Sequence, residues 1–427
     1  MKVLHLFSKS ALLFVFCLAL FPIRAAEVTE TRSDTLLLRY LNEHGVQATD
    51  SNRVQLIFSG HEKFEMLFED IRQARHYIHL EYFNFRNDSI AGLLFELLKE
   101  KVKEGVAVRA MFDDFGNKSN NRPLKKHHLE ELRAAGIDII RFDPIRFPYV
   151  NHIFHRDHRK IVVIDGRVAY TGGMNIADYY IEGLPEIGPW RDMHLRLEGK
   201  SVQDLHQILI DTWEGETKER IPDEERQHYA PSVPEEEPVG IGPARVAIVD
   251  RKAKDKRLKK LLRRTFVETI NGAQDSLTLI NPYFTPTRKV RSALKKAAER
   301  GLKLKIMVSP NGDIPVTPNA SLYTAKQLMK RGAEVWLFYG GFHHSKTMTV
   351  DGTHCTVGSA NLNSRSLRCD YEVNTFIFNQ EATAEIDSLF RDDCKQSKLM
   401  TREVWKKDFS PWKRFRCWLA NLLTPFL

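Results

Sequence analysis

The sequence predicts an α/β protein built from two similar lobes, each with a mixed or largely parallel β-sheet covered by helices. Two observations lead to this fold class. First, units made of a helix, a glycine and a buried strand recur in both halves of the chain, and such alternation is typical of α/β sheets. Second, one polar motif occurs once in each half, which indicates an internal duplication. A chain of 427 residues is long enough for two lobes, each with its own core.

The repeated units can be followed in order along the chain. In each unit an amphipathic helix ends at or near a small residue, and an apolar run typical of a buried strand follows. The helices and their strands are 68–74 with 77–80, 93–104 with 105–111, and 129–136 with 137–140 in the first half, and 266–273 with 277–279, 290–300 with 301–307, and 325–332 with 334–337 in the second half. The matching order supports a duplication.

The duplicated motif combines a histidine, a lysine and an aspartate with a trailing small pair and an asparagine. Its copies are His158, Lys160, Asp165, Gly172, Gly173 and Asn175, and His344, Lys346, Asp351, Gly358, Ser359 and Asn361. A single histidine–lysine–aspartate match arises by chance in roughly one such chain in ten or twenty. Two copies with the same internal spacing are not accidental. Two histidines, each with a lysine two residues further on, can act together on one phosphodiester.

Each motif predicts a strand, a tight turn and a second short strand. These cover 158–164, 165–166 and 168–171 in the first copy, and 346–350, 351–352 and 354–357 in the second copy. Strand alternation places His158 and Lys160 on one face. A carboxylate seven residues from the histidine lies roughly 20 Å away along a straight strand. The spacing therefore assigns Asp165 and Asp351 to turns and backbone rather than to the reacting phosphorus.

Two further carboxylates occupy comparable places in the two halves. Asp192 lies downstream of the first motif, and Glu372 follows His344 by 28 residues. A carboxylate on one imidazole nitrogen fixes the tautomer and stabilises the imidazolium. We therefore expect Asp192 and Glu372 to orient the histidines, and the alternative is that each forms a surface salt bridge.

No metal or other cofactor is expected. His152, His155 and His158 recur at a spacing of three residues, which could suggest zinc. However, Pro148 and the strand that begins at His158 argue against one helical face. The 5 cysteines include no pair separated by two residues, so small buried side chains are expected instead of a disulfide framework.

These motifs resemble those of the phospholipase D superfamily. Residues 37–427 as a whole resemble the bacterial cardiolipin synthases, with finer similarities in the segments 190–194, 280–284 and 358–366. The resemblance implies two α/β/α lobes related by pseudo-twofold symmetry. It also implies that the two motifs meet in one active site at the interface of the lobes.

The resemblance further implies roles for the site residues. The expected catalytic set is His158, Lys160, Asp165, His344, Lys346 and Asp351, and the expected binding set is Asn175, Asn361, Asp192 and Glu372. One histidine attacks phosphorus and forms a phosphohistidine, while the other protonates the leaving alcohol and deprotonates the incoming one. The lysines and asparagines bind the phosphoryl oxygens. The sequence does not distinguish the two histidines, although the analogy favours His158 as nucleophile and His344 as acid.

The two ends of the chain suggest membrane contact. Residues 1–26 have a basic start and an apolar run of about 13 residues, which fits a signal peptide or an N-terminal anchor. Such a run is short of the roughly 20 residues that span a bilayer. Residues 401–427 are basic, and apolar side chains recur at helical spacing from Phe415 to Phe426. We expect an interfacial helix, and packing of this helix on the protein's own core is the alternative.

Composition suggests the remaining boundaries. We expect lobes at 35–220 and 244–400, joined by a linker at 221–243 that is rich in proline and glutamate. The net charge is +9, and much of the excess lies in the basic stretch 251–264. A helix there would suit an anionic bilayer or nucleic acid, and the alternative is a solvated helix face.

The predicted function is that of a cardiolipin synthase, which transfers a phosphatidyl group between two phosphatidylglycerol molecules and releases glycerol. The alternatives are a phospholipase D that hydrolyses phospholipid and a nuclease of the superfamily, because acceptor choice depends on pocket shape and water exclusion. A non-catalytic phosphate-binding module is disfavoured, because both motifs are complete. The expected partners are phosphatidylglycerol and an anionic membrane rather than nucleic acid. The expected location is the bacterial cell membrane, with export to the periplasm as the alternative.

Overall fold

A computed structural model describes residues 30–145, 154–229 and 240–425 of the chain. The chain from Thr31 onward forms one compact unit. The predicted N-terminal segment at 1–26 and the apolar position Phe426 lie outside the described residues. Within the described ranges, no helix has both the length and the apolar character needed to cross a membrane.

The first half contributes eight strands and seven α-helices in its described residues. The strands are β1 (Thr49–Ile57), β2 (Tyr77–Tyr82), β3 (Ala107–Asp113), β4 (Asp138–Phe142), β5 (Ile161–Ile164), β6 (Val168–Gly172), β7 (Trp190–Arg191) and β8 (His194–Glu198). The helices are α1 (Arg32–Glu43), α2 (Gly60–Gln73), α3 (Ser89–Lys103), α4 (Asp114–Ser119), α5 (Lys126–Ala134), α6 (Tyr179–Glu182) and α7 (Ser201–Thr217).

The second half repeats this succession with additions at its end. Its strands are β9 (Ile241–Arg251), β10 (Ser276–Ile280), β11 (Lys303–Val308), β12 (Glu334–Phe338), β13 (Phe342–His343), β14 (Thr347–Val350), β15 (His354–Gly358), β16 (Glu372–Phe378) and β17 (Ser397–Leu399). Its helices are α8 (Leu261–Gly272), α9 (Arg288–Glu299), α10 (Thr317–Met329), α11 (Ser364–Arg368), α12 (Gln380–Cys394), α13 (Arg402–Lys407) and α14 (Pro411–Leu422).

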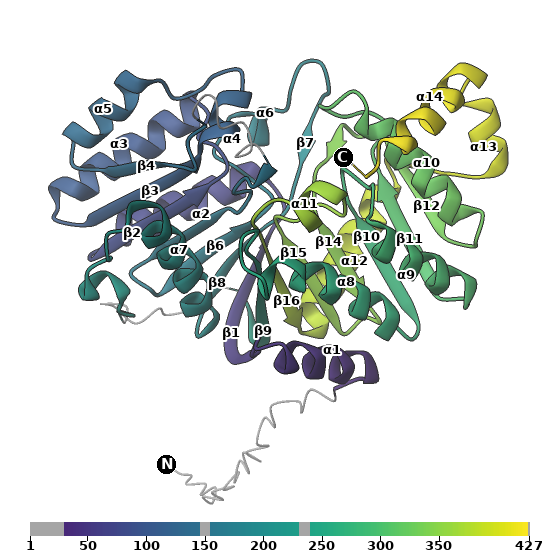
Figure 1. Ribbon diagram of the computed structural model, residues 1–427, viewed down its shortest axis with the longest axis horizontal. Helices are drawn as coiled ribbons and strands as arrows, with labels where there is room; N and C mark the ends of the chain where they lie inside the picture. Colours follow the sequence, from purple (N-terminus) through teal and green to yellow (C-terminus); the bar gives the residue numbers. More distant parts are fainter. Residues whose placement is uncertain (1–29, 146–153, 230–239, 426–427) are drawn as a thin grey trace, which may run out of the picture. The chain divides into compact units, whose positions relative to one another are not determined.

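One mixed sheet of 15 strands runs through the described residues of both halves (Figure 1). β1 and β9 pair antiparallel near its centre. Outward from this pair, β8, β6, β5, β2, β3 and β4 on one side correspond in order to β16, β15, β14, β10, β11 and β12 on the other. In both halves the last three of these strands are parallel to one another, and the others pair antiparallel. The predicted α/β fold with two related lobes is therefore confirmed.

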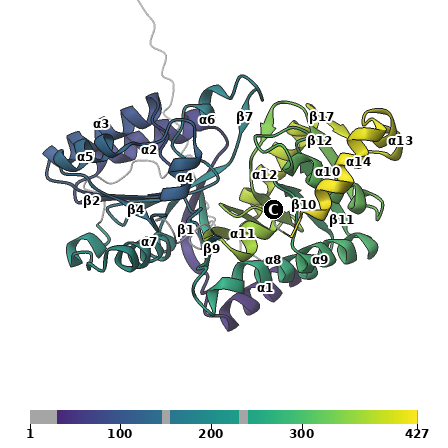
Figure 2. The same ribbon diagram turned by 45° about the horizontal axis from the view of Figure 1, so that its top comes forward.

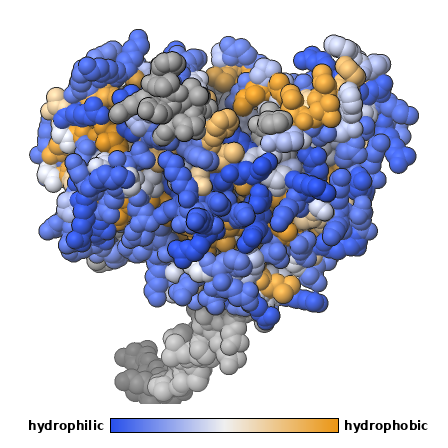
Figure 3. Space-filling model, viewed as in Figure 1, coloured by the Kyte–Doolittle hydropathy of each residue, from blue (hydrophilic) through white to orange (hydrophobic). Residues whose placement is uncertain are grey.

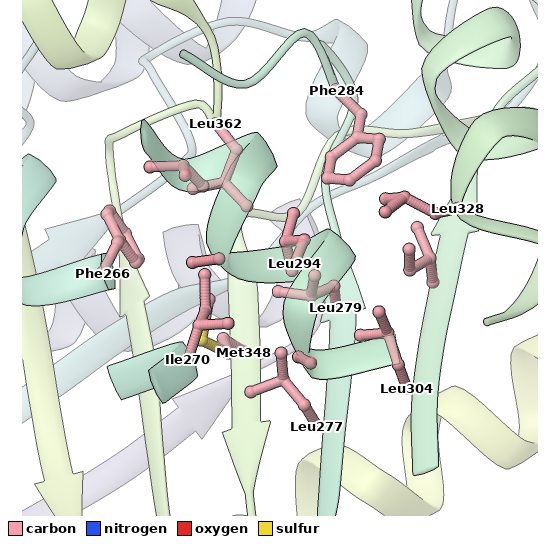
Figure 4. Packing of buried hydrophobic residues seen from close by; sticks show 14 of the residues in the cluster. Phe266, Ile270, Leu277, Leu279, Phe284, Leu294, Leu304, Leu328, Met348 and Leu362 are labelled. Atoms are coloured by element: carbon pink, nitrogen blue, oxygen red, sulfur yellow. The ribbon is translucent and has the colours of Figure 1, made fainter. Parts of the chain in front are cut away.

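Helices cover both faces of the sheet, and strand alternation divides the core between the faces. On β2, Ile78 and Leu80 pack with α2, α3 and α5, whereas Tyr77 packs with α7. In the second half α8, α9 and α10 cover one face, where Ile270 and Leu294 pack over β10 and β11 (Figure 4). α12 lies in the same apolar cluster as α7 on the other face. This layering agrees with the α/β/α lobes implied by the family resemblance.

Both predicted hairpins are present. Asp165 and Gly166 have φ angles of 53° and 62°, and Asp351 and Gly352 have φ angles of 52° and 69°. Two consecutive residues with positive φ define the type I′ turn, which matches the twist of the flanking strands and favours Asp-Gly. β5 begins three residues after His158, later than predicted, because the segment before it pairs with the other half of the chain.

The predicted start of the N-terminal lobe at residue 35 is wrong. α1 packs on the C-terminal lobe, where Leu37 and Leu41 join the core that contains Phe266 of α8. The Asp34 carboxylate also lies 2.6 Å from Nδ1 of His354. Figure 1 shows α1 beneath β9 and α8. An amphipathic helix has an apolar face to bury, but its sequence does not specify which lobe receives that face.

The predicted linker at 221–243 is longer than the segment that joins the lobes. Glu225 packs on the N-terminal lobe, where it accepts a hydrogen bond from Arg109 Nε at 2.7 Å and contacts His79 Nε2 at 2.8 Å. The last residues of the predicted linker belong to β9. The predicted basic helix at 251–264 is present only in its second half, because buried Arg251 ends β9, a 3-10 turn covers Leu258–Lys260 and α8 begins at Leu261.

The C-terminal segment forms two helices rather than one. A break at Ser410 and Pro411 separates α13 from α14, and the Ser410 hydroxyl caps α14 by accepting from the Lys413 backbone at 3.1 Å. Figure 2 shows α14 beside α10. Cys417 and Ala420 are buried, whereas most of the predicted apolar stripe stays exposed. The alternative interpretation, packing on the protein's own core, therefore holds for part of the helix, and membrane contact of the exposed stripe stays a prediction.

Candidate active site

The two motif histidines line one cavity of about 470 Å³. Both motif asparagines also reach its wall. Six aromatic side chains complete most of the lining, namely Phe83, Phe115, Tyr179, Tyr180, Trp190 and Tyr283. These residues come from both halves of the chain, so the predicted meeting of the two motifs in one site is present in the structure.

His158 is held by the opposite half. A parallel bridge joins Asp157 to Tyr371, and the His158 backbone N–H donates to the Tyr371 carbonyl at 3.0 Å. This register brings the next residue on each segment together. Nδ1 of His158 consequently lies 3.1 Å from Oε1 of Glu372, the first residue of β16.

His344 is held in the same manner by the first half. β7 and β13 pair in parallel, with Trp190 opposite Phe342 and Arg191 opposite His343. The His344 backbone N–H donates to the Arg191 carbonyl at 2.6 Å, and its Nδ1 lies 2.6 Å from Oδ2 of Asp192. The two histidine–carboxylate pairs are therefore crossed between the halves, which spacing along the chain did not indicate.

The crossed pairing does not support the substrate-binding role predicted for Asp192 and Glu372. The side chains of Asp192 and Glu372 are both 0% exposed, and each is engaged by a histidine. Neither residue lines the cavity. Their geometry supports the other expectation, that they orient the imidazoles, because each carboxylate lies within hydrogen-bond distance of Nδ1. Nζ of Lys346 also lies 2.8 Å from Nδ1 of His344 and 3.3 Å from its Nε2.

The trailing small pair of each motif has a steric cause. A Cβ atom on Gly173 would lie 2.2 Å from Oδ1 of Asp192, so this position must be glycine. The equivalent Ser359 has room for a hydroxyl, which donates to Oε2 of Glu372. Gly173 of the first motif thus leaves room for the Asp192 carboxylate, whereas Ser359 of the second motif donates a hydrogen bond to the Glu372 carboxylate.

The two motif lysines are buried behind the histidines. Nζ of Lys160 donates to the His158 carbonyl at 2.5 Å, and Nζ of Lys346 donates to the His344 carbonyl at 2.5 Å. Burial lowers the pKa of Lys160 to about 7, although Glu372 opposes this shift. Neither lysine lines the cavity. The structure thus brings neither ammonium group to the cavity wall, and the contact between the lysines and phosphoryl oxygens stays a prediction.

The two motif asparagines reach the cavity, and their contact with substrate stays a prediction. Asn175 and Asn361 both line the cavity. Their Oδ1 atoms are buried and have no hydrogen-bond partner among the described residues. Nδ2 of Asn175 donates to the Tyr180 hydroxyl at 3.3 Å. Buried polar atoms without partners are rare, so these amides are available to a bound ligand.

Burial keeps both histidines neutral near pH 7. It lowers the pKa of His158 to about 4, and Lys160 adds to this shift while Glu372 opposes it. Burial and Lys346 also lower the pKa of His344, against the opposing effect of Asp192. Although burial alone would raise it, His158 and Lys160 hold the pKa of Glu372 at about 2. The site therefore presents neutral imidazoles beside ionised carboxylates.

Asp165 and Asp351, which the motif placed in the catalytic set, lie elsewhere. Asp165 accepts from the backbone N–H groups of 75–77, each at 2.9 Å. Asp351 accepts from those of 274–276 at 2.8 to 3.2 Å. Both carboxylates fix the turn from a helix into the next strand, and neither lines the cavity. The structure therefore does not support Asp165 and Asp351 as catalytic residues. It agrees with the spacing argument, which assigned them to turns and backbone.

Sequence reasoning missed two acidic residues of the cavity. Asp370 accepts from Arg365 at 2.9 Å, and burial raises its pKa to about 7. Its position two residues before Glu372 was the signal that could have revealed it, since strand alternation aims both side chains alike. Asp313 accepts from the Tyr283 hydroxyl at 2.7 Å. It lies in the loop after β11, for which the sequence carried no signal.

The histidine series considered for zinc does not converge in the described residues. Nδ1 of His155 lies 3.0 Å from the Cys369 carbonyl, and His152 lies outside the described residues. No group of three histidine, cysteine, aspartate or glutamate side chains in the described part of the chain is arranged to hold a metal ion. The four described cysteines are free thiols.

Two α/β/α lobes that share a site with one histidine from each duplicated motif define the class of phospholipase D-like proteins. The family model described as "Cardiolipin synthase, PLD-like domain" matches residues 67–188 and 266–394. The chain therefore belongs to the cardiolipin synthase family of phospholipase D-like proteins.

Two relatives agree with this assignment, and a solved structure shows the same fold. The chain is 35% identical over 354 residues to a probable cardiolipin synthase of Bacillus subtilis, covering 83% of this chain and 68% of the relative. It is 33% identical to the cardiolipin synthase of Oceanobacillus iheyensis, covering 92% of this chain and 79% of the relative. The crystal structure of phosphatidylserine synthase from Haemophilus influenzae has the same fold, with a TM-score of 0.70 at 14% identity, covering 92% of this chain and 100% of the other.

Proposed function

We propose that this protein is a cardiolipin synthase, which transfers a phosphatidyl group from one phosphatidylglycerol to a second and releases glycerol. The observation that carries the proposal is the pair of crossed histidine–carboxylate pairs facing one cavity. Curated relatives over most of the chain are named cardiolipin synthases. A double displacement at phosphorus requires one neutral imidazole as nucleophile and a second imidazole that gains and loses a proton, and the ionised carboxylates orient both.

In the first step, Nε2 of His158 attacks the phosphorus of the donor lipid. The reactive form carries a proton on His344 while His158 is neutral, although both imidazoles are mostly neutral near pH 7. The bond from phosphorus to the glycerol oxygen breaks, and that oxygen takes the proton of His344. The contact of 2.6 Å between His344 and Asp192 is shorter than that between His158 and Glu372, so it stabilises an imidazolium better. We therefore assign His344 as the acid and His158 as the nucleophile.

In the second step, the hydroxyl of another phosphatidylglycerol gives its proton to His344 and its oxygen attacks the phosphohistidine. The bond between phosphorus and nitrogen breaks, and both histidines return to their starting states. Amide groups of Asn175 and Asn361 bind the equatorial oxygens, where charge builds up in the transition state. The six aromatic side chains of the cavity limit access of water and favour an alcohol acceptor.

We place the protein on the bacterial cell membrane through α14. Its large apolar side chains face outward, with Trp412 66% and Phe415 46% exposed. Figure 3 shows hydrophobic surface where Figure 1 draws this helix. Lys413, Arg414 and Arg416 lie on the same helix. Exposed aromatic groups next to cations are typical of helices that lie in the interface of an anionic bilayer.

The function is tested by mass spectrometry of phosphatidylglycerol liposomes incubated with the purified protein. Cardiolipin and glycerol in equal amounts are expected, and His158→Ala and His344→Ala should each abolish both products. Phosphatidic acid without cardiolipin would make the protein a hydrolase. No turnover of lipid, with cleavage of DNA or RNA instead, would make it a nuclease of the superfamily.

A further inference from the structure

A second cavity, of about 500 Å³, lies on the other side of α11 from the active-site cavity. The start of α9, α11 and the residues after α14 line it. Four cationic side chains reach this cavity, namely Arg288, Arg291, Lys295 and Arg368, and no acidic side chain does. We refer to it as the basic cavity. Arg365 and Arg368 on the short helix α11 line the active-site cavity and the basic cavity, respectively.

Two buried polar atoms of the basic cavity lack partners among the described residues, although Nη2 of Arg291 donates to the Pro286 carbonyl at 3.3 Å. Thr287 is 7% exposed, and its Oγ1 has no hydrogen-bond partner among the described residues. The same holds for Nε of Arg291. Burial lowers the pKa of Arg291, and burial together with Arg331 and Arg291 lowers that of Lys295. A cluster of cations without a carboxylate is stabilised by an added anion.

The first half of the chain has an equivalent position at the start of α3, where carboxylates of the protein itself take the place of a ligand. Asp88 and Thr287 are the N-cap residues of the equivalent helices α3 and α9. Asp178 and Ser364 each follow a motif asparagine by three positions. Asp178 accepts from the first backbone N–H groups of α3, at 3.1 and 2.7 Å. At α9 neither carboxylate exists, and Thr287 makes no side-chain cap hydrogen bond.

We propose that the basic cavity binds the phosphate of an anionic phospholipid headgroup as a second lipid site, distinct from the catalytic cavity. The phosphate takes the place that Asp178 occupies in the first half. The first turn of α9 offers backbone N–H groups and its positive dipole end. Arg291, Lys295 and Arg368 supply the charge, and the Thr287 hydroxyl donates to a phosphate oxygen.

The position of the cavity favours a lipid over free phosphate. Thr424 and Pro425 line it, directly after the exposed apolar residues Leu422 and Leu423. A headgroup in the basic cavity therefore has apolar surface beside it for its acyl chains. The membrane contact proposed for α14 brings the same end of the helix to the bilayer.

Equilibrium dialysis of soluble dihexanoyl-phosphatidylglycerol tests the second site in the His158→Ala protein, in which no turnover removes the lipid. We expect three lipids bound per chain at saturation, the donor and the acceptor in the catalytic cavity and one in the basic cavity. Adding Arg291→Gln and Lys295→Gln should weaken one of the three sites at least about tenfold, because two charged hydrogen bonds are lost. The matched control, Lys296→Gln with Lys330→Gln, removes the same charge from exposed positions outside the cavity and should leave all three sites intact.

A second variant distinguishes loss of the lipid site from misfolding of the protein. Thr287→Asp restores the N-cap carboxylate of the first half, which stabilises a helix start, and it should also remove one bound lipid by filling the cavity. Two lipids per chain before any cavity substitution, or three with unchanged affinity after the Arg291 and Lys295 changes, would overturn the proposal. Equal affinity for inorganic phosphate would overturn the lipid assignment. Because binding is measured without turnover, these outcomes are independent of whether cardiolipin is the product.

Discussion

Each catalytic histidine depends on a carboxylate that lies far away in the sequence. His158 and Glu372 are 214 positions apart, and His344 and Asp192 are 152 positions apart. In both pairs a backbone hydrogen bond from the histidine N–H to the residue before the carboxylate sets the register. The contact between the halves therefore sets the orientation of each imidazole. The geometry of these two residues thus depends on the fold of the whole chain.

A double-mutant cycle tests the crossed pairing. Glu372→Gln should lower kcat on phosphatidylglycerol by about 10²–10⁴-fold, because the tautomer of His158 is no longer fixed. In a His158→Ala background the same change should have almost no further effect, since paired residues are not additive. Asp192→Asn should show this behaviour with His344→Ala. Additive losses for His158 with Glu372 would contradict the pairing.

The pKa of His158 predicts the acid limit of activity. Its pKa of about 4 means that the imidazole is neutral and nucleophilic above this pH and protonated below it. We expect kcat/KM for a soluble phosphodiester to fall by about tenfold per pH unit below about pH 4. Because Glu372 raises the pKa of His158, the residual activity of Glu372→Gln should show this limit at lower pH. A limit that moves upward would contradict the assignment, and circular dichroism at each pH controls for acid unfolding.

At the scale of elements, the Asp-Gly turns join strands that lie outside the site. Asp165 binds three consecutive backbone N–H groups at the start of β2. We expect Asp165→Ala to lower the free energy of unfolding by about 2 kcal/mol, because one buried and two partly buried donors lose their acceptor. The kcat of the folded fraction should stay near that of the parent. Thermal denaturation and kcat measure the two effects, and exposed Asp392→Ala is the control. A large loss of kcat in fully folded protein would instead show that Asp165 takes part in catalysis.

The apolar face of α14 predicts membrane binding. Leu419→Ser with Leu422→Ser should weaken sedimentation with anionic vesicles by at least about tenfold, since each exposed leucine contributes about 1.5–3 kcal/mol on burial. The buried contacts of Cys417 and Ala420 remain, so the fold should persist. The control is the equally polar change Leu93→Ser with Leu399→Ser, also at exposed positions. Equal loss of binding in both variants would argue against α14 as the docking element.

Local chemistry explains which elements could be predicted. The hairpins at 165–166 and 351–352 followed from Asp-Gly between β-branched runs, because the turn type demands those residues. The position of α1 on the C-terminal lobe did not follow, since an amphipathic helix fits any apolar surface. The first part of the basic stretch 251–264 was mistaken for a helix, because its charge pattern hid the buried end of β9 at Arg251.

At the scale of the whole molecule, one sheet joins the halves. The antiparallel pair of β1 and β9 makes two lobes into a single structure, and the buried Asn52 side chain donates to Ala244 across this pair. The duplication was visible in the sequence because the motifs repeat. The contacts of Asp192 and Glu372 with the histidines of the opposite lobes were not visible in the sequence. No local pattern encodes the register of β7 with β13 or of Asp157 with Tyr371.

The central claim is that His158 carries the phosphoryl group while His344 moves protons. The most direct measurement is peptide mass spectrometry after brief reaction of the His344→Ala protein with a p-nitrophenyl phosphodiester. Its leaving group needs no acid, but the second step lacks its base. We predict that a covalent phosphoryl adduct accumulates on His158, and that the His158→Ala protein forms none. An adduct on His344 in the His158→Ala protein, or no adduct in either protein, would contradict the account.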